Sequence, residues 1–211
     1  MPYRKSDIEA ALKHLRKRDK AMRDIIDRVG EFTLKTKRDY FALLVRSIVS
    51  QQISTAAART ILSRLTDHVA PHKISATAIA GLSIDQLRSL GVSQQKATYV
   101  LDLARHVNDG LLDLSRLARM TDDQIIESLV AVKGIGVWTA QMFLIFGLGR
   151  LDVFPVGDLG IKNAIARRYG FEEAPTSSEM IAVAQPWRPY ASIASWYLWR
   201  SLELPDHSSQ S

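Results

Sequence analysis

The sequence predicts an all-α fold of roughly ten short helices. Apolar residues recur at spacings of three and four along nearly the whole chain, which is the pattern of amphipathic helices. Several of these stretches begin with a capping box or a single Asp or Ser and end at Gly or Pro. No segment shows the alternation of a hairpin or the strand–helix order of a parallel sheet. With 46% apolar and 24% charged residues, the composition is that of an ordinary globular protein.

The first helical stretch is expected to start at Ser6, because the four residues through Glu9 have the form of a capping box. Apolar side chains follow at helical spacing as far as Val29, and Gly30 is a suitable end. Residues 1–40 contain 12 basic and 7 acidic side chains, so they carry +5 of the net charge of +6. This excess fits a polyanionic partner, although a solvated helix face explains it as well.

Caps and breakers place the remaining helices. Asp39 is expected to cap a second helix, and Ser54 or Thr55 a third that runs to about Val69 before Pro71. Further boundaries are marked by capping boxes at 83–86 and 121–124, by Asp158 and Gly170, and by Pro189.

The absence of cysteine excludes disulfides, thiolate zinc sites, a catalytic thiol and any cysteine-ligated iron–sulfur cluster. No apolar run approaches the roughly 20 residues of a membrane span. The charged residues that follow Met1 are not those of a signal peptide. We therefore expect a cytoplasmic protein with no membrane contact.

Residues 129–140 contain the most informative motif, Leu-Val-Ala-Val-Lys-Gly-Ile-Gly-Val-Trp-Thr-Ala. Gly134 and Gly136 let the backbone turn tightly between two helices and approach a partner closely. The N–H groups that open the second helix suit an anion such as phosphate, bound without reading sequence. Taken alone, a Gly-x-Gly turn is more typical of a purely structural turn. A degenerate copy with a single glycine lies at 87–97.

The surroundings of this turn favour the binding role. Segment 151–158, Leu-Asp-Val-Phe-Pro-Val-Gly-Asp, ends at an expected helix start. A hairpin, a helix and a Gly/Pro loop ending in Asp together resemble the helix-hairpin-helix DNA glycosylase superfamily. Segments 45–54 and 186–196 are similar to that family's DNA-inserting loop and to the C-terminal helix of its alkylpurine branch. The resemblance covers roughly residues 39–204.

The resemblance implies a two-lobed helical fold with the active site in the cleft between the lobes. One lobe is expected to contain residues 1–38 and 152–204, and the other residues 39–151 with the hairpin at 129–140. Residues 205–211 are expected to form a disordered tail.

Two features favour the 3-methyladenine DNA glycosylase II (alkylpurine) type. In bifunctional relatives a lysine after the hairpin forms a Schiff base with the sugar, and Trp138 stands at the matching position. The four-cysteine cluster of other branches is impossible in a chain without cysteine. The chain departs from the longer bacterial members in having no room for their β-rich N-terminal domain, so a compact form is expected.

The resemblance assigns catalysis to Asp158. Breaking an N-glycosidic bond builds positive charge on the deoxyribose, which a neighbouring carboxylate stabilises while it orients a water. A plain N-cap is the alternative role for this residue. Asp152 is expected to be a structural loop residue, and Lys162 a phosphate contact or a helix-surface partner of Asp158.

No general acid is evident beside this carboxylate, which favours bases that already carry a positive charge. An electron-rich aromatic pocket would hold an alkylated, cationic base by stacking and cation–π attraction. The resemblance implies a pocket of Trp138, Trp196, Tyr197 and Tyr40, with Met142 where relatives carry a tyrosine. Trp187 and Trp199 are expected to be packing residues.

The DNA contacts implied by the resemblance lie in three turns. Gln51 and Gln52 stand where the family inserts a wedge beside the flipped base, although a surface helix linker is the alternative. The main-chain carbonyls of Val130, Val132 and Ile135 match those that hold a monovalent cation, Na⁺ or K⁺, in relatives. Further expected contacts are Ser93, Gln94, Gly134, Ile135, Gly136, Val137, Thr139 and Lys162.

Together these features predict a monomeric, monofunctional hydrolase that excises alkylated purines of the 3-methyladenine and 7-methylguanine type from double-stranded DNA for base excision repair. It would flip the base, have no lyase activity and require no cofactor. If prokaryotic, it would be associated with the nucleoid. The alternatives are a glycosylase for hypoxanthine, uracil or a mismatched base, and a non-catalytic DNA-binding module.

Overall fold

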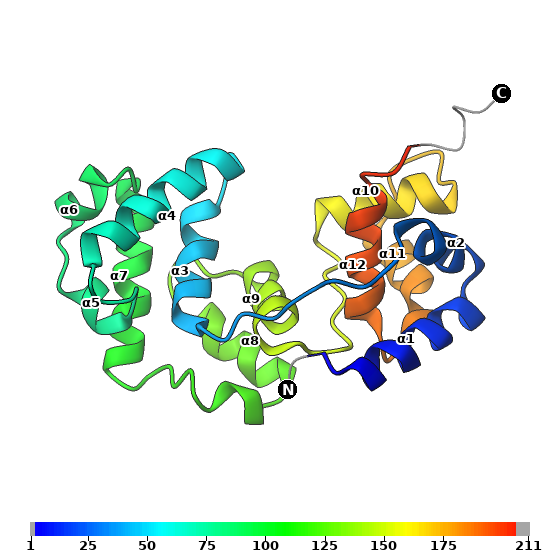
Figure 1. Ribbon diagram of the computed structural model, residues 1–211, viewed down its shortest axis with the longest axis horizontal. Coiled ribbons are helices and arrows are strands. Elements are labelled where there is room, and N and C mark those ends of the chain that lie inside the picture. The colour runs from blue at the N-terminus through cyan, green and yellow to red at the C-terminus, as the bar shows by residue number, and fades with distance from the viewer. Residues whose placement is uncertain (1–2, 206–211) are drawn as a thin grey trace. The chain divides into compact units, whose positions relative to one another are not determined.

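The computed structural model describes residues 3–205, and within them the secondary structure is helical, with no strand. The expected all-α fold is confirmed. The chain forms two compact units, one from Met1–Thr36 and Leu144–Ser211, the discontinuous unit, and one from Lys37–Phe143, the central unit (Figure 1). Of the expected disordered tail, residues 206–211 lie outside the described residues. No helix within 3–205 combines the length and the apolar character needed to cross a bilayer.

Helix α7 occupies the middle of the central unit. It packs against α3, α5 and α6, while α3 also packs against α4 and α9, and α8 against α9. Leu44, Ile48, Leu65, Ile79 and Leu103 are fully buried between these helices. The elements are α3 (Tyr40–Ser50), α4 (Thr55–Val69), α5 (Ala76–Ala80), α6 (Ile84–Ser89), α7 (Gln94–Asn108), a 3₁₀ turn (Leu117–Arg119), α8 (Asp122–Val130) and α9 (Val137–Phe143).

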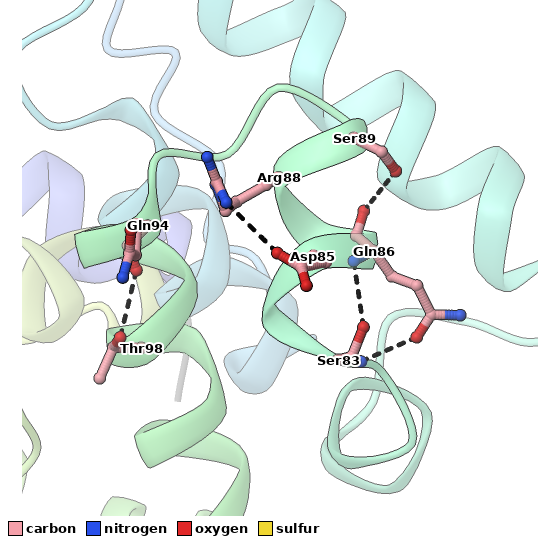
Figure 2. A network of polar contacts seen from close by, with 7 residues as sticks. All are labelled: Ser83, Asp85, Gln86, Arg88, Ser89, Gln94 and Thr98. Atoms are coloured by element: carbon pink, nitrogen blue, oxygen red, sulfur yellow. Dashed lines mark hydrogen bonds and ion pairs between the residues drawn. The ribbon is translucent and has the colours of Figure 1, made fainter.

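The helix starts of this unit follow the expected caps. The Asp39 carboxylate accepts the N–H of Ala42 at 3.1 Å, and the Ser54 hydroxyl caps α4. Figure 2 shows the box at α6, where the Ser83 hydroxyl accepts the N–H of Gln86 at 3.1 Å. In return the side-chain oxygen Oε1 of Gln86 accepts the N–H of Ser83 at 2.8 Å. A second reciprocal box starts α8, so the capping boxes predicted at 83–86 and 121–124 are confirmed.

Helix α12 is the centre of the discontinuous unit. It packs against α1, α2 and α10, and every residue from 191 to 198 is buried. A helix that is covered on all sides carries apolar and small residues all round, which explains its weak amphipathicity. The elements are α1 (Lys5–Arg18), α2 (Lys20–Val29), a π-helical turn (Leu144–Leu148), α10 (Leu159–Tyr169), α11 (Ser177–Ala184), a 3₁₀ turn (Gln185–Trp187) and α12 (Ala191–Ser201).

The N-terminal stretch differs from the expectation in two ways. The predicted capping box at Ser6 is wrong, because α1 already begins at Lys5 and the side chain of the N-cap residue, Arg4, makes no capping hydrogen bond. The stretch is also two helices, since the chain extends at Asp19. The end at Gly30 is confirmed, with φ +83° after the last residue of α2.

Asp19, at this break, binds one local and two distant donors. Its Oδ1 accepts the N–H of Met22 at 2.9 Å and so caps α2. Its Oδ2 accepts the Trp187 indole N–H and the Tyr169 hydroxyl, both at 2.7 Å. One carboxylate therefore joins α2 to α10 and to the 3₁₀ turn before α12.

Replacing Asp19 with Ala should lower the free energy of unfolding by about 2–4 kcal/mol. The loss combines a helix cap, worth about 1 kcal/mol, with the loss of the acceptor for the buried Trp187 indole and the half-buried Tyr169 hydroxyl. Asp39→Ala is the control, because Asp39 caps α3 through one exposed hydrogen bond and should cost only about 1 kcal/mol. Urea denaturation of both variants measures the difference, and equal losses would show that the two distant donors add nothing.

Candidate active site and nucleic-acid interface

The hairpin turn joins the end of α8 at Val130 to the start of α9 at Val137. Gly134 has φ +81°, and a Cβ there would lie 2.1 Å from the ring of Tyr99 on α7. Gly136 differs, because its φ is not positive and a Cβ at this position would meet no atom within 4 Å. The first glycine is thus required by the fold, whereas the second leaves an open surface at the turn.

A buried carboxylate holds the hairpin from inside. Asp102 on α7 accepts the backbone N–H of Lys133 at 3.0 Å, and its other oxygen accepts from Arg105 at 3.0 Å. Burial alone would raise the pKa of Asp102, but the bonds from Lys133 and Arg105 and the nearby His106 together hold it below its usual value. The charge therefore stays on the carboxylate that fixes the turn at Lys133, the residue before Gly134.

The loop between α3 and α4 is tied to the same turn. Val49 and Gln51 lie at the C-terminal end of α3. The Lys96 ammonium on α7 donates to their backbone carbonyls at 2.8 and 2.5 Å. Burial lowers the pKa of Lys96. The Gln51 side-chain N–H donates in turn to the Gly134 carbonyl at 2.8 Å. Loop and hairpin are thus joined by a direct hydrogen bond and by α7.

This arrangement distinguishes two neighbouring glutamines that the sequence alone left equivalent. The Gln51 side chain is occupied by the hairpin. Gln52 is exposed and has φ +54°, a left-handed conformation that a non-glycine residue adopts only where its surroundings hold it. Gln52 therefore stands outward at the tip of the loop.

Asp158 lies at the N-terminus of α10 in the discontinuous unit, only 8% exposed. Its Oδ1 accepts the N–H of Ile161 at 2.8 Å and the indole N–H of Trp199 on α12 at 2.9 Å. Asp152, by contrast, binds Arg188 at 2.8 Å and the first N–H of α12 at 3.2 Å. Asp152 therefore serves the local structure, whereas Asp158 is a buried carboxylate with a donor that helix capping does not require.

Comparison with known proteins decides the family. Residues 45–189 match the family described as HhH-GPD superfamily base excision DNA repair protein. The chain belongs to this superfamily.

Three relatives show how far the similarity extends. The Bacillus subtilis protein YfjP is 38% identical over 166 residues, which are 76% of this chain but only 58% of YfjP. The crystal structure of a DNA-3-methyladenine glycosidase from Bacillus halodurans matches with TM-score 0.83 and 37% identity, over 90% of this chain and 88% of that chain. The Schizosaccharomyces pombe 3-methyladenine DNA glycosylase, in complex with abasic DNA, matches with TM-score 0.85 and 27% identity, over 94% and 98%.

Within this HhH-GPD chain, the expected pocket residues belong to different units. Trp138 is 46% exposed at the start of α9, Met142 is buried in the same helix, and Tyr40 packs edge-on against Phe143. These residues lie in the central unit. Their common pocket with the residues of the other unit stays a prediction.

The two aromatic candidates of the discontinuous unit are both buried on α12. The Trp196 ring packs edge-on against Phe32 and Tyr197, with centroids 4.7 and 4.8 Å apart. Tyr197 has no exposed surface, and its hydroxyl donates to the carbonyl of Gly30 at 2.9 Å. Tyr197 is therefore held by the core, whereas Trp196 keeps 7% of its surface exposed.

The other residues expected to contact DNA differ in exposure and in the hydrogen bonds that they make within the chain. Val137 is 53% exposed, but Ile135 and Thr139 are buried, so the last two offer a partner little beyond their main chain. In the degenerate hairpin, the Ser93 hydroxyl caps α7. The carbonyl of Gln94 accepts the Thr98 hydroxyl one turn later (Figure 2). Lys162 is half-buried one turn after Asp158.

Sequence reasoning missed four residues of the site, namely Lys96, Tyr99, Asp102 and Trp199. The first three are spaced by three residues, which places them on one face of α7. That spacing is a signal the sequence does contain. Trp199 was assigned to packing, and only the fold brings it to Asp158.

Gly134→Ala should lower the free energy of unfolding by about 2–4 kcal/mol. The new Cβ would overlap the Tyr99 ring, and alanine is strained at positive φ. Gly136→Ala is the matched variant two residues away and should change stability by less than about 0.5 kcal/mol. Urea denaturation measures both, and a similar loss in the two variants would show that the open surface at Gly136 is misassigned.

Proposed function

We propose that this chain is a monofunctional DNA glycosylase that hydrolyses the N-glycosidic bond of alkylated purines in duplex DNA, as a base excision repair enzyme. Asp158 carries the proposal, because it is a buried carboxylate held by two N–H donors at a helix N-terminus in an HhH-GPD chain. The similar Bacillus halodurans and S. pombe structures are named as 3-methyladenine enzymes, which supports the substrate class.

The chemistry follows from the charge that develops during bond cleavage. As the base leaves, the deoxyribose becomes cationic, and a carboxylate placed beside it lowers the barrier electrostatically. The two N–H groups hold the Asp158 carboxylate at the N-terminus of α10 through hydrogen bonds to one oxygen. A purine alkylated at N3 or N7 is already cationic and leaves as a neutral base. The enzyme then needs no general acid for these substrates.

The same residues favour hydrolysis over strand cleavage. Trp138 stands where bifunctional relatives carry their Schiff-base lysine, and an indole nitrogen is not an amine nucleophile. Water is then the attacking group, and the product is an intact strand with an abasic site. Trp138 and Trp196 would supply ring faces to the cationic base.

DNA would be held by the central unit. The hairpin N–H groups and the open surface at Gly136 suit a phosphate, and Gln52 is the residue we assign to the gap left by the flipped base. The S. pombe relative was crystallised with abasic DNA, which supports DNA as the partner. We further propose that the protein acts as a monomer in the cytoplasm or at the nucleoid.

A monovalent cation at the hairpin is part of the proposal. Its ligands would be the carbonyls of Val130, Val132 and Ile135, which hold the turn against a phosphate. The Val132 carbonyl accepts the N–H of Ile135 at 3.1 Å and has a second lone pair for an ion. Among residues 3–205, no group of three or more acidic or histidine side chains is placed to bind a metal ion. No other cofactor enters the mechanism proposed.

Asp158→Asn should reduce base release by about 100- to 1,000-fold, because a neutral amide cannot stabilise the developing cation. Single-turnover release of 7-methylguanine from a defined duplex measures the rate, and anisotropy with abasic-site DNA measures binding, which should survive. Asp152→Asn is the control, since that carboxylate binds Arg188 and the first N–H of α12 and should affect stability alone.

Excision by Asp158→Asn at the wild-type rate would remove Asp158 from the mechanism. A wild-type chain that binds the duplex but releases no base from any lesion would be a non-catalytic module instead.

The enzyme should prefer bases that carry their own positive charge. At neutral pH we expect release of 7-methylguanine to exceed release of hypoxanthine from matched duplexes by at least about tenfold, because a desolvated cation–π contact is worth about 2 kcal/mol. Trp138→Leu is the diagnostic variant, and it should slow release of the cationic base more than that of the neutral one. Faster release of hypoxanthine at neutral pH would require a general acid and would overturn this preference.

A further inference from the structure

We propose that Trp199 is a positioning residue, which holds the Asp158 carboxylate in its reactive orientation through the indole N–H. The inference rests on the proposed function, since it assigns a role relative to the catalytic group named there. Asp158 would be a complete helix cap without Trp199, because the N–H of Ile161 at 2.8 Å already fulfils that requirement. The second donor comes from a residue 41 positions away and binds the same oxygen at 2.9 Å.

The indole ring of Trp199 is also held by stacking against one of its faces. Phe146, in the π-helical turn, stacks on Trp199 with centroids 5.6 Å apart and planes inclined by 27°. π-helical turns are rare in proteins, and those that occur are often found at functional sites. Here the turn carries Phe146, whose ring supports the Trp199 indole. The direction of the N–H is thus set by packing as well as by the hydrogen bond.

Gly160 shows how closely the pair is fitted into α10. A Cβ at this position would lie 3.1 Å from Oδ1 of Asp158, 3.1 Å from Cδ1 of Trp199 and 3.3 Å from its Nε1. Glycine in the first turn of a helix is unfavourable by its propensity, so a local reason is needed. The reason is the space that the carboxylate and the indole nitrogen occupy together.

Two donors on one oxygen restrict the rotation of the carboxylate. A carboxylate stabilises the transition state only if its charge already lies where the cation develops. Small displacements of such a group lower the reaction rate strongly. Trp199 contacts Asp158 and not the substrate in this assignment. Its loss should therefore lower the rate of the chemical step and leave DNA binding intact.

The test compares two Trp→Phe variants of the full chain. Trp199→Phe removes the N–H and keeps a ring against Phe146. Trp187→Phe is the matched control, because the Trp187 indole N–H binds Asp19 at 2.7 Å in the same unit, outside the site. Single-turnover release of 7-methylguanine gives the rate, and binding of abasic-site DNA gives Kd.

We expect Trp199→Phe to lower the single-turnover rate by about 10- to 100-fold and to change Kd by less than about twofold. Trp187→Phe should lower stability and leave the rate of the folded enzyme unchanged. A third protein with 3-benzothienylalanine at position 199 keeps the ring shape but has sulfur in place of N–H, so it tests the same bond should the Phe variant not fold. It should be as slow as Trp199→Phe.

Wild-type rates for the N–H-deficient proteins, alongside an inactive Asp158→Asn, would overturn the positioning role and leave the proposed function standing. Loss of rate in Trp187→Phe equal to that in Trp199→Phe would also overturn it, because the effect would then be structural. An active Asp158→Asn would instead show that the proposed function itself is wrong.

Discussion

One face of α7 determines the shape of the whole DNA-facing side proposed for the central unit. Lys96, Tyr99 and Asp102 are spaced by three residues, and each fixes a different part of that side. Lys96 ends α3 and sets the loop that presents Gln52, while Tyr99 fills the space under the first hairpin glycine. Asp102 holds the hairpin backbone at Lys133. The hairpin and the loop are therefore not independent elements, since a change in α7 reaches both.

The discontinuous unit contains the same hydrogen-bonding arrangement at two helix starts. Asp19 and Asp158 both cap a helix, and both accept a tryptophan N–H from a distant segment, Trp187 and Trp199 respectively. A carboxylate removed from water is unfavourable unless donors replace the lost hydration, and each of these has at least two. At Asp19 the result is three joined segments. At Asp158 the result is a carboxylate held at the start of α10 by two hydrogen bonds, and the proposed mechanism uses this carboxylate.

Local signals explain which parts of the fold were predictable. The helix starts at Asp39, Ser83, Thr121 and Asp158 were correctly predicted, because a cap is read from a few adjacent residues. The break at Asp19 was not predicted, since apolar spacing continues across it and its partners lie 150 and 168 residues away.

The site was predictable to a similar degree, and for similar reasons. The catalytic candidate and the hairpin are short contiguous motifs. The difference between the two loop glutamines depends on a contact between Gln51 and Gly134, which no spacing encodes. The boundary between the units after Phe143 has no sequence signal either, because α9 continues directly into the π-helical turn.

Three glycines differ in what occupies the space where a Cβ would lie. At Gly134 the space of a side chain is filled by the Tyr99 ring, and at Gly160 by Asp158 and Trp199. Both absences of a Cβ are therefore explained within the chain. At Gly136 nothing of the chain comes within 4 Å, and the backbone does not have a positive φ. The fold itself does not require a glycine there, and a DNA phosphate approaching the hairpin N–H groups is the occupant that the proposed function provides for this open surface.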